Sequence, residues 1–229
     1  MPPTLEERLA LVREGVADAA ALAGRSPDDI TTIVVTKFHP ASLVRELHAL
    51  GVRELGENRH QEAQAKAAEL ADLATGDDPL RWNFIGQLQS KKAKQVRAYA
   101  SSVHSLDRDS VREALAAPGP DLDVYVQLNL TDDAGRGGVQ DDELESFVER
   151  VLTTSGLRLR GVMAVAPIDE EPRRAFARVR AASDRLRALA PDAVAISAGM
   201  SGDYRDAILE GATHLRIGSA ITGNRPVAG

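Results

Sequence analysis

The sequence contains no cysteine, and this absence removes several kinds of chemistry at once. Disulfide bonds, thiolate nucleophiles and zinc sites built on thiolates are all excluded. Aromatic residues make up only 3%, against 43% hydrophobic and 27% charged residues, which is a composition typical of globular domains. The five histidines show neither the H-x-x-x-H nor the H-x-H spacing of metal ligands. We therefore expect no metal site.

Positive charge and long apolar runs are also lacking. The formal net charge of −6 argues against a chain-wide affinity for nucleic acid or anionic membranes, although a small basic pocket for a phosphate is still allowed. No apolar run approaches the length of a membrane span, and Met1–Glu7 has neither the basic nor the apolar part of a signal peptide. We expect a cytoplasmic protein.

Apolar segments alternate with amphipathic ones along the whole chain. We predict strands, each followed by a helix or helical turn, at residues 30–36, 54–55, 81–85, 102–105, 123–130, 157–165, 193–197 and 213–217. Strict alternation indicates a parallel sheet, and this number of units favours a (β/α)₈ TIM barrel. A dinucleotide-binding sheet is the rival, but Thr36–His39 follows the first strand where G-x-G-x-x-G would be needed.

The barrel is expected to be the only domain. Residues 1–29 are predicted to form an extra N-terminal helix and a loop, and residues 30–229 the barrel, with no further domain. Thr4 and Glu7 fit a capping box at the start of that helix. Function in such a barrel lies on the loops that follow the strands, so those loops hold the candidate site residues.

Lys37 ends the first predicted strand, a β-branched run that reads as buried. A lysine at the end of a buried strand can lose its charge by desolvation and form a Schiff base with an aldehyde. The alternative is an ordinary lysine whose stem is covered while its ammonium stays in water. The strand by itself leaves both interpretations open.

The loops after the seventh and eighth strands are rich in glycine and serine and lead into helices. Barrels often bind phosphate at these two positions, although Ser201 and Ser219 are also ordinary helix-capping residues. A lysine opposite a phosphate-binding loop suits pyridoxal 5′-phosphate (PLP), with Arg216 as a donor to the pyridine nitrogen. The alternative for Arg216 is a surface or ion-paired arginine.

Several motifs, in order along the chain, resemble those of one family. They are Val35–Lys37, Gly56–Asn58, Phe84–Lys92, His104–Arg108, Gly161–Met163, Ser197–Asp203 and Arg216–Ile221. Together they resemble the pyridoxal phosphate homeostasis protein family, the YggS/PROSC-like group. The resemblance covers essentially the whole chain and implies a fold-type III PLP barrel, like the N-terminal domain of alanine racemase but standing alone.

The resemblance also implies roles for particular residues. The implied cofactor-binding residues are Lys37 as the Schiff-base lysine, Arg216 beside the pyridine nitrogen, Ser201, Gly218 and Ser219 at the phosphate, and Asn58 and Met200 around the cofactor. It implies buffering or delivery of PLP through a reversible Schiff base, without robust turnover, and apo PLP-dependent enzymes as partners. The chain departs from the family pattern at Phe38, Gln87, Lys91 and the loop 135–138.

The main alternative is a PLP-dependent amino-acid racemase of the alanine racemase type. Such an enzyme needs a second acid/base group, usually a tyrosine from an additional domain and a partner subunit. Tyr204, just past the phosphate loop, is the nearest of the three tyrosines. A barrel enzyme acting on sugar phosphates without PLP would need paired carboxylates, and Glu57 and Asp107 are isolated from each other in the sequence. We expect a non-catalytic monomer.

Overall fold

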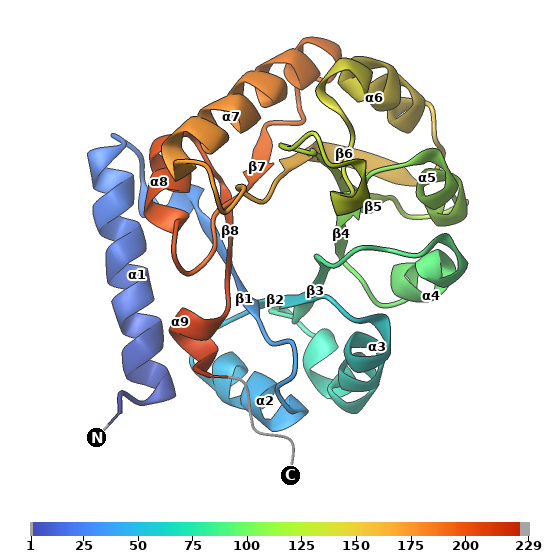
Figure 1. The fold of residues 1–229 in the computed structure, drawn as a ribbon. Helices are drawn as coiled ribbons and strands as arrows, with labels where there is room; N and C mark the ends of the chain where they lie inside the picture. Colours follow the sequence, from blue (N-terminus) through green and yellow to red (C-terminus); the bar gives the residue numbers. More distant parts are fainter. Residues whose placement is uncertain (1, 225–229) are drawn as a thin grey trace.

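Eight parallel strands close into a barrel in chain order in the computed structural model, which describes residues 2–224 except for the side chain of Ala134 (Figure 1). The strands are β1 (Thr31–Val35), β2 (Glu54–Glu57), β3 (Arg81–Phe84), β4 (Ser102–Leu106), β5 (Leu122–Gln127), β6 (Leu157–Met163), β7 (Ala195–Ser197) and β8 (His214–Ile217). The predicted TIM barrel is confirmed. Residues 1 and 225–229 of the predicted domain lie outside the described part.

The helices alternate with the strands and surround them. The α-helices are α1 (Leu5–Leu22), α2 (Ala41–Ala49), α3 (His60–Glu69), α4 (Ala93–Arg97), α5 (Asp109–Leu115), α6 (Leu144–Leu152), α7 (Pro172–Leu189), α8 (Tyr204–Leu209) and α9 (Ser219–Thr222). Short 3₁₀ segments fill several connections, at Pro27–Asp29, Ala71–Ala74, Ser90–Lys92, Ala134–Arg136 and Asp141–Glu143. Among the described residues, no helix has both the length and the apolar character needed to span a membrane.

The first and last strands pair with each other and so close the barrel. Thr31 of β1 lies opposite His214 of β8, and Val34 lies opposite Ile217. The chain between Val35 and Lys37 therefore ends beside the chain that follows Ile217. Closure places the carboxyl ends of the first and the last strand at one part of the barrel mouth.

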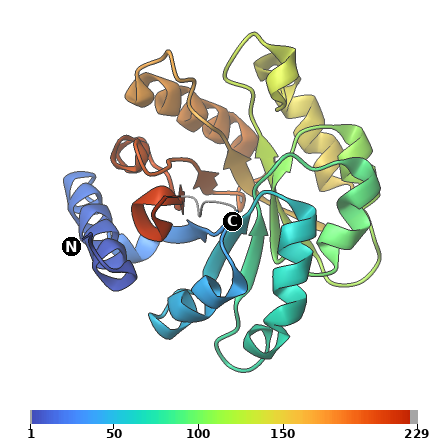
Figure 2. The ribbon, with the colours of Figure 1, turned by 60° about the horizontal axis from the view of Figure 1, so that its bottom comes forward.

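The extra N-terminal helix is held against the barrel by side chains and by one close approach. Thr4 and Glu7 form the predicted capping box. Helix α1 then packs beside α8 and α9, as Figures 1 and 2 show from two directions. A Cβ atom on Gly15 would lie 2.2 Å from the hydroxyl oxygen of Tyr204, so glycine is needed where the two helices touch.

Some element boundaries differ from those predicted. The fifth strand ends at Gln127 and not at residue 130, because the chain then turns into the loop that carries Gly137 and Gly138 at positive φ. The N-cap residue of α5 is Arg108, and the carboxylate of the preceding Asp107 accepts hydrogen bonds from Arg108 and from the N–H of Gly138.

Candidate functional site

Lys37 lies in a short turn just after the carboxyl end of β1, and its side chain is exposed. The N–H of His39 donates to the carbonyl of Thr36 and closes the turn. Phe38, with φ +68°, occupies the left-handed region that favours glycine, and its N–H donates to Glu62 of α3 at 3.0 Å. The Lys37 amine makes no hydrogen bond or ion pair with any described residue. It is therefore free to react with a ligand at the mouth.

A buried lysine lies directly beneath this turn, and it is Lys66 of α3. Its ammonium donates to the carbonyl of Thr36 at 2.7 Å and to the Glu57 carboxylate at 2.6 Å. The hydroxyl of Thr36 donates to the same carboxylate oxygen. Burial raises the pKa of the Glu57 carboxyl, and the charge and hydrogen bond of Lys66 oppose this. Helix α3 thus holds the lysine-bearing turn on both sides, through Glu62 and Lys66.

No feature of the sequence indicates this ion pair. Lys66 stands in a helix of alanine, glutamate, glutamine and lysine, a composition typical of a solvated surface helix. Its side chain is nevertheless only 9% exposed, and that of Glu57 only 2%. The sequence separation of Glu57 and Lys66 does not indicate that they are in contact, because Glu57 is on β2 and Lys66 is on the following helix.

Arg216 points into the barrel from β8 and is almost fully buried, at 4% exposure. One terminal nitrogen donates to the carbonyl and to the hydroxyl of Ser197, and the other donates to the carbonyl of Ala164, all within 2.7–2.8 Å. It makes no ion pair with the described residues, so it is neither the surface nor the ion-paired arginine of the alternative interpretation. Burial lowers its pKa to about 10, and the guanidinium stays protonated at neutral pH.

The loops after β7 and β8 lie against each other. The N–H of Ala220 donates to the hydroxyl of Ser201 at 3.2 Å, so this serine bridges the two loops and does not cap its own helix. The backbone N–H groups of Ser201, Gly202, Gly218 and Ser219 have no hydrogen-bond partner among residues 2–224. A Cβ atom on Gly202 would meet nothing within 4 Å, so the space beside this glycine is open. Backbone N–H groups without a hydrogen-bond partner suit an anion.

Asn58 and Met200 complete the predicted set. The side-chain oxygen of Asn58, after β2, is buried and has no hydrogen-bond partner among the described residues. Met200, in the loop after β7, is 39% exposed. The structure places all seven predicted residues after, or at the end of, strands β7, β8, β1 and β2, which are consecutive around the closed barrel. One part of the mouth therefore combines an amine, a buried cation and free N–H groups.

The three tyrosines have partners other than Lys37. The hydroxyl of Tyr204 packs against Gly15 of α1. Tyr125 stacks inside the barrel, and Tyr99 lies beside His60, with burial raising the pKa of both phenols. Among residues 2–224, none of these phenols makes a hydrogen bond with Lys37.

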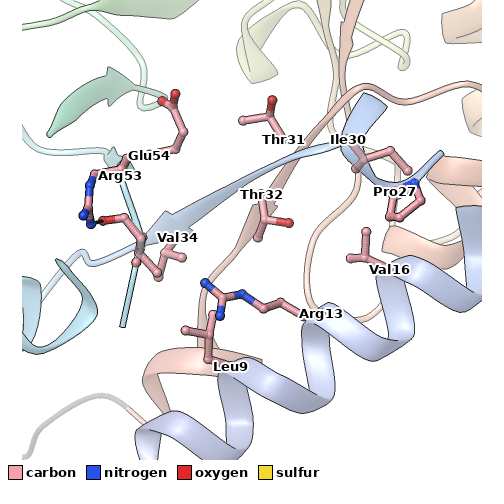
Figure 3. A pocket seen from close by; sticks show the side chains of 12 residues that line it. Leu9, Arg13, Val16, Pro27, Ile30, Thr31, Thr32, Val34, Arg53 and Glu54 are labelled. Carbon is pink, nitrogen blue, oxygen red and sulfur yellow. Dashed lines mark hydrogen bonds between the residues drawn. The ribbon is translucent and has the colours of Figure 1, made fainter. Parts of the chain in front are cut away.

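One cavity lies away from this mouth, between α1 and the amino-terminal ends of β1 and β2, and has a volume of about 350 Å³. Figure 3 shows Leu9, Arg13 and Val16 of α1 reaching toward Thr32 on β1. A smaller cavity of about 190 Å³ does lie at the mouth, between the loops after β2 and β3, and is lined by Asn58 and Lys92. Among residues 2–224, no cluster of His, Asp or Glu is arranged to hold a metal ion.

Comparison with known proteins agrees with this geometry. The family described as "Alanine racemase, N-terminal domain" matches residues 13–226. The pyridoxal phosphate homeostasis protein of Pseudomonas aeruginosa is 41% identical over 230 residues, covering 97% of this chain and 96% of the relative. The chain belongs to the pyridoxal phosphate homeostasis protein family. The family's Escherichia coli K12 member is 37% identical, covering 96% of this chain and 97% of that relative.

Solved structures extend the comparison. PipY of Synechococcus elongatus PCC7942, with PLP bound, has a TM-score of 0.82 at 33% identity and covers 96% of this chain and 100% of its own. Alanine racemase of Corynebacterium glutamicum has a TM-score of 0.69 at 16% identity, and only 62% of that chain is covered. The second likeness concerns the fold alone. The family predicted from the motifs is confirmed.

Proposed function

We propose that this chain binds PLP at the barrel mouth and holds it reversibly, so that it buffers the cofactor and delivers it to other proteins. One observation carries the proposal. The Lys37 amine, which has no hydrogen-bond or ion-pair partner among the described residues, follows β1, and the buried guanidinium of Arg216 is on β8, the strand that pairs with β1. PLP carries an aldehyde, a phosphate and a pyridine nitrogen, and each group has a complementary partner here.

Each residue then has a distinct role. The Lys37 amine condenses with the aldehyde, with loss of one water, and addition of water reverses the step. Ser201, Gly218 and Ser219 receive the phosphate with their N–H groups and hydroxyls. Arg216 offers a hydrogen bond to the pyridine nitrogen and keeps it unprotonated, since a guanidinium is a donor only. Asn58 and Met200 line the remaining surface of the cofactor.

The holding role follows from what surrounds the lysine. Racemisation needs an acid/base group on each face of the substrate, and the three tyrosines are engaged with α1, His60 and the barrel interior. An arginine at the ring nitrogen also weakens the ring as an electron sink. The partners we propose are PLP and apo forms of PLP-dependent enzymes. We also propose that the protein is a monomer.

Covalent labelling tests the binding site. PLP is added to the purified protein, the linkage is reduced with borohydride, and the labelled peptide is found by mass spectrometry. We expect the label on Lys37, its loss in Lys37→Ala, and its retention in Lys92→Ala at the same mouth. Labelling of Lys37→Ala to the wild-type extent would overturn the assignment.

Delivery is tested separately from binding. Loaded protein is mixed with an apo PLP-dependent enzyme in the presence of a trap for free PLP. Reactivation of the enzyme faster than the trap permits from free PLP supports delivery, and its absence contradicts it. Rapid interconversion of D- and L-alanine by the loaded protein would favour the racemase instead.

A further inference from the structure

A chain of hydrogen bonds crosses the interior of the barrel, where branched apolar side chains usually pack. It runs from the mouth to the opposite end through Arg216, Ser197, His104, Ser102, Asn83 and Glu54. The successive donor–acceptor distances are 2.8, 2.8, 2.9, 2.6 and 2.8 Å. We call these six residues the barrel relay. Every link has the length of a good hydrogen bond.

The carboxylate end fixes the direction of the relay. Glu54 only accepts, so the amide nitrogen of Asn83 donates to it and the amide oxygen of Asn83 faces Ser102. The Ser102 hydroxyl donates to that oxygen and must therefore accept from Nε2 of His104. His104 thus carries its proton on Nε2.

The arginine end is consistent with the same direction. A guanidinium only donates, so the oxygen of Ser197 accepts from Arg216. A neutral ring with its proton on Nε2 has an unprotonated Nδ1, which accepts the hydroxyl proton of Ser197. The carboxylate end of the relay therefore requires the proton on Nε2, and the arginine end accommodates that neutral tautomer.

The surroundings of His104 agree with a neutral ring. The side chain is fully buried, and it stacks on Tyr125 with ring centroids 4.0 Å apart. Burial lowers its pKa well below the ordinary value, and the nearby His214 and Arg216 act in the same direction. The stack fixes the plane of the ring, and the two serines fix its rotation within that plane.

We propose that His104 is a positioning residue for the cofactor, and that the barrel relay sets the orientation in which Arg216 meets the pyridine nitrogen. Ser197 accepts from Arg216 while its own proton is held by His104, so the histidine fixes the rotation of the hydroxyl that Arg216 meets. Three of the five N–H groups of Arg216 are committed to Ser197 and Ala164, which leaves two for a ligand. This role rests on the proposed function, since it acts on the PLP site.

Two serines on β4 provide a matched test. Ser102→Ala removes the acceptor for Nε2 of His104, whereas Ser105→Ala removes a hydroxyl that is also buried but has no partner among the described residues. ¹⁵N NMR of the histidines is recorded without cofactor, and PLP affinity and the absorbance of the bound cofactor are measured for both variants.

We expect one tautomer, protonated on Nε2, for His104 in the wild type and in Ser105→Ala. In Ser102→Ala we expect a mixture of tautomers, PLP affinity weakened about tenfold and a shifted absorbance maximum, because a buried donor is left unpaired. Affinity for inorganic phosphate, which tests the loops alone, stays unchanged.

Two results would overturn the proposal. One is a wild-type His104 protonated on Nδ1, or on both nitrogens. The other is an equal effect of the two serine substitutions on PLP binding and absorbance. The tautomer is measured without PLP, so a wild type that shows the expected tautomer but fails to bind PLP refutes the proposed function and not the relay.

Discussion

Removing the buried ammonium of Lys66 tests how the lysine-bearing turn is held. Methionine at this position keeps the length of the side chain but leaves the Glu57 carboxylate buried with the Thr36 hydroxyl as its remaining partner. The Thr36 carbonyl keeps the N–H of His39. The cost of Lys66→Met therefore falls mainly on the carboxyl of Glu57.

The sign of the pH dependence follows from the protonation of that carboxyl. With Lys66 gone, burial raises the pKa of Glu57 unopposed by the ammonium, so the folded state binds the proton more tightly than the unfolded state does. The free energy of unfolding then falls as the pH rises above the pKa of the unfolded state. Breaking a buried ion pair by removing one partner costs about 3–5 kcal/mol, and we expect a loss at the lower end of this range, about 3 kcal/mol, at pH 7.

Denaturant unfolding at pH 5, 6, 7 and 8 measures this dependence. We expect the loss in Lys66→Met to grow with pH, and the melting temperature at pH 7 to fall by about 6–12 °C. Adding Glu57→Gln to Lys66→Met should recover most of the loss and flatten the pH dependence. Arg45→Met, at an ion pair whose side chains are 47% and 56% exposed, should have a much smaller effect. A loss in Lys66→Met that is equal at pH 5 and pH 8 would refute the reasoning.

Three further substitutions test other parts of the barrel. Gly161→Ala should destabilise the fold by roughly 3 kcal/mol in thermal unfolding. The reason is that φ of Gly161 is +151° and that a Cβ atom there would lie 1.8 Å from the carbonyl oxygen of Ala195. Unchanged stability would contradict this close packing. Gly202→Ala should leave stability within about 0.5 kcal/mol, because the added methyl group meets nothing within 4 Å. It should weaken the binding of PLP more than that of pyridoxal in equilibrium titrations, because the methyl group restricts the loop beside Ser201, which we propose binds the phosphate. Equal weakening of both ligands would argue against a phosphate at this loop. Burial lowers the pKa of His214 to about 4, so the contribution of the neutral ring to stability is complete above pH 6.5 and is lost as the pH falls toward 4. His214→Gln should therefore reduce the loss of unfolding free energy between pH 6.5 and pH 4 by up to roughly 3 kcal/mol. An unaltered dependence of stability on pH would exclude His214 as its source.

The fold was accessible from the sequence because each unit repeats a local pattern. Buried β-branched strands and amphipathic helices alternate, and the strand ends follow from where each apolar run stops. Lys37 and Arg216 were found for the same reason, since a strand end in such a barrel is a position at the mouth. Their location there is observed, while their roles toward PLP stay predictions.

The buried polar groups were not accessible in this way. Lys66 and Glu57 look like solvated residues, and His104 carries no ligand spacing. Their burial depends on contacts between segments far apart in the chain, such as His104 with Ser197, 93 residues later. No local pattern records such a pairing.

The sequence by itself determined the barrel, the family and the set of chemical groups at the mouth. Only the tertiary structure decided that the free amine belongs to Lys37 while the buried one belongs to Lys66. It also decided that Arg216 is held by carbonyls and a hydroxyl and not by a carboxylate. The physical reason is that alternation of apolar and polar residues specifies which face of a strand is buried, whereas the partner of a buried charge is set by barrel closure and helix packing.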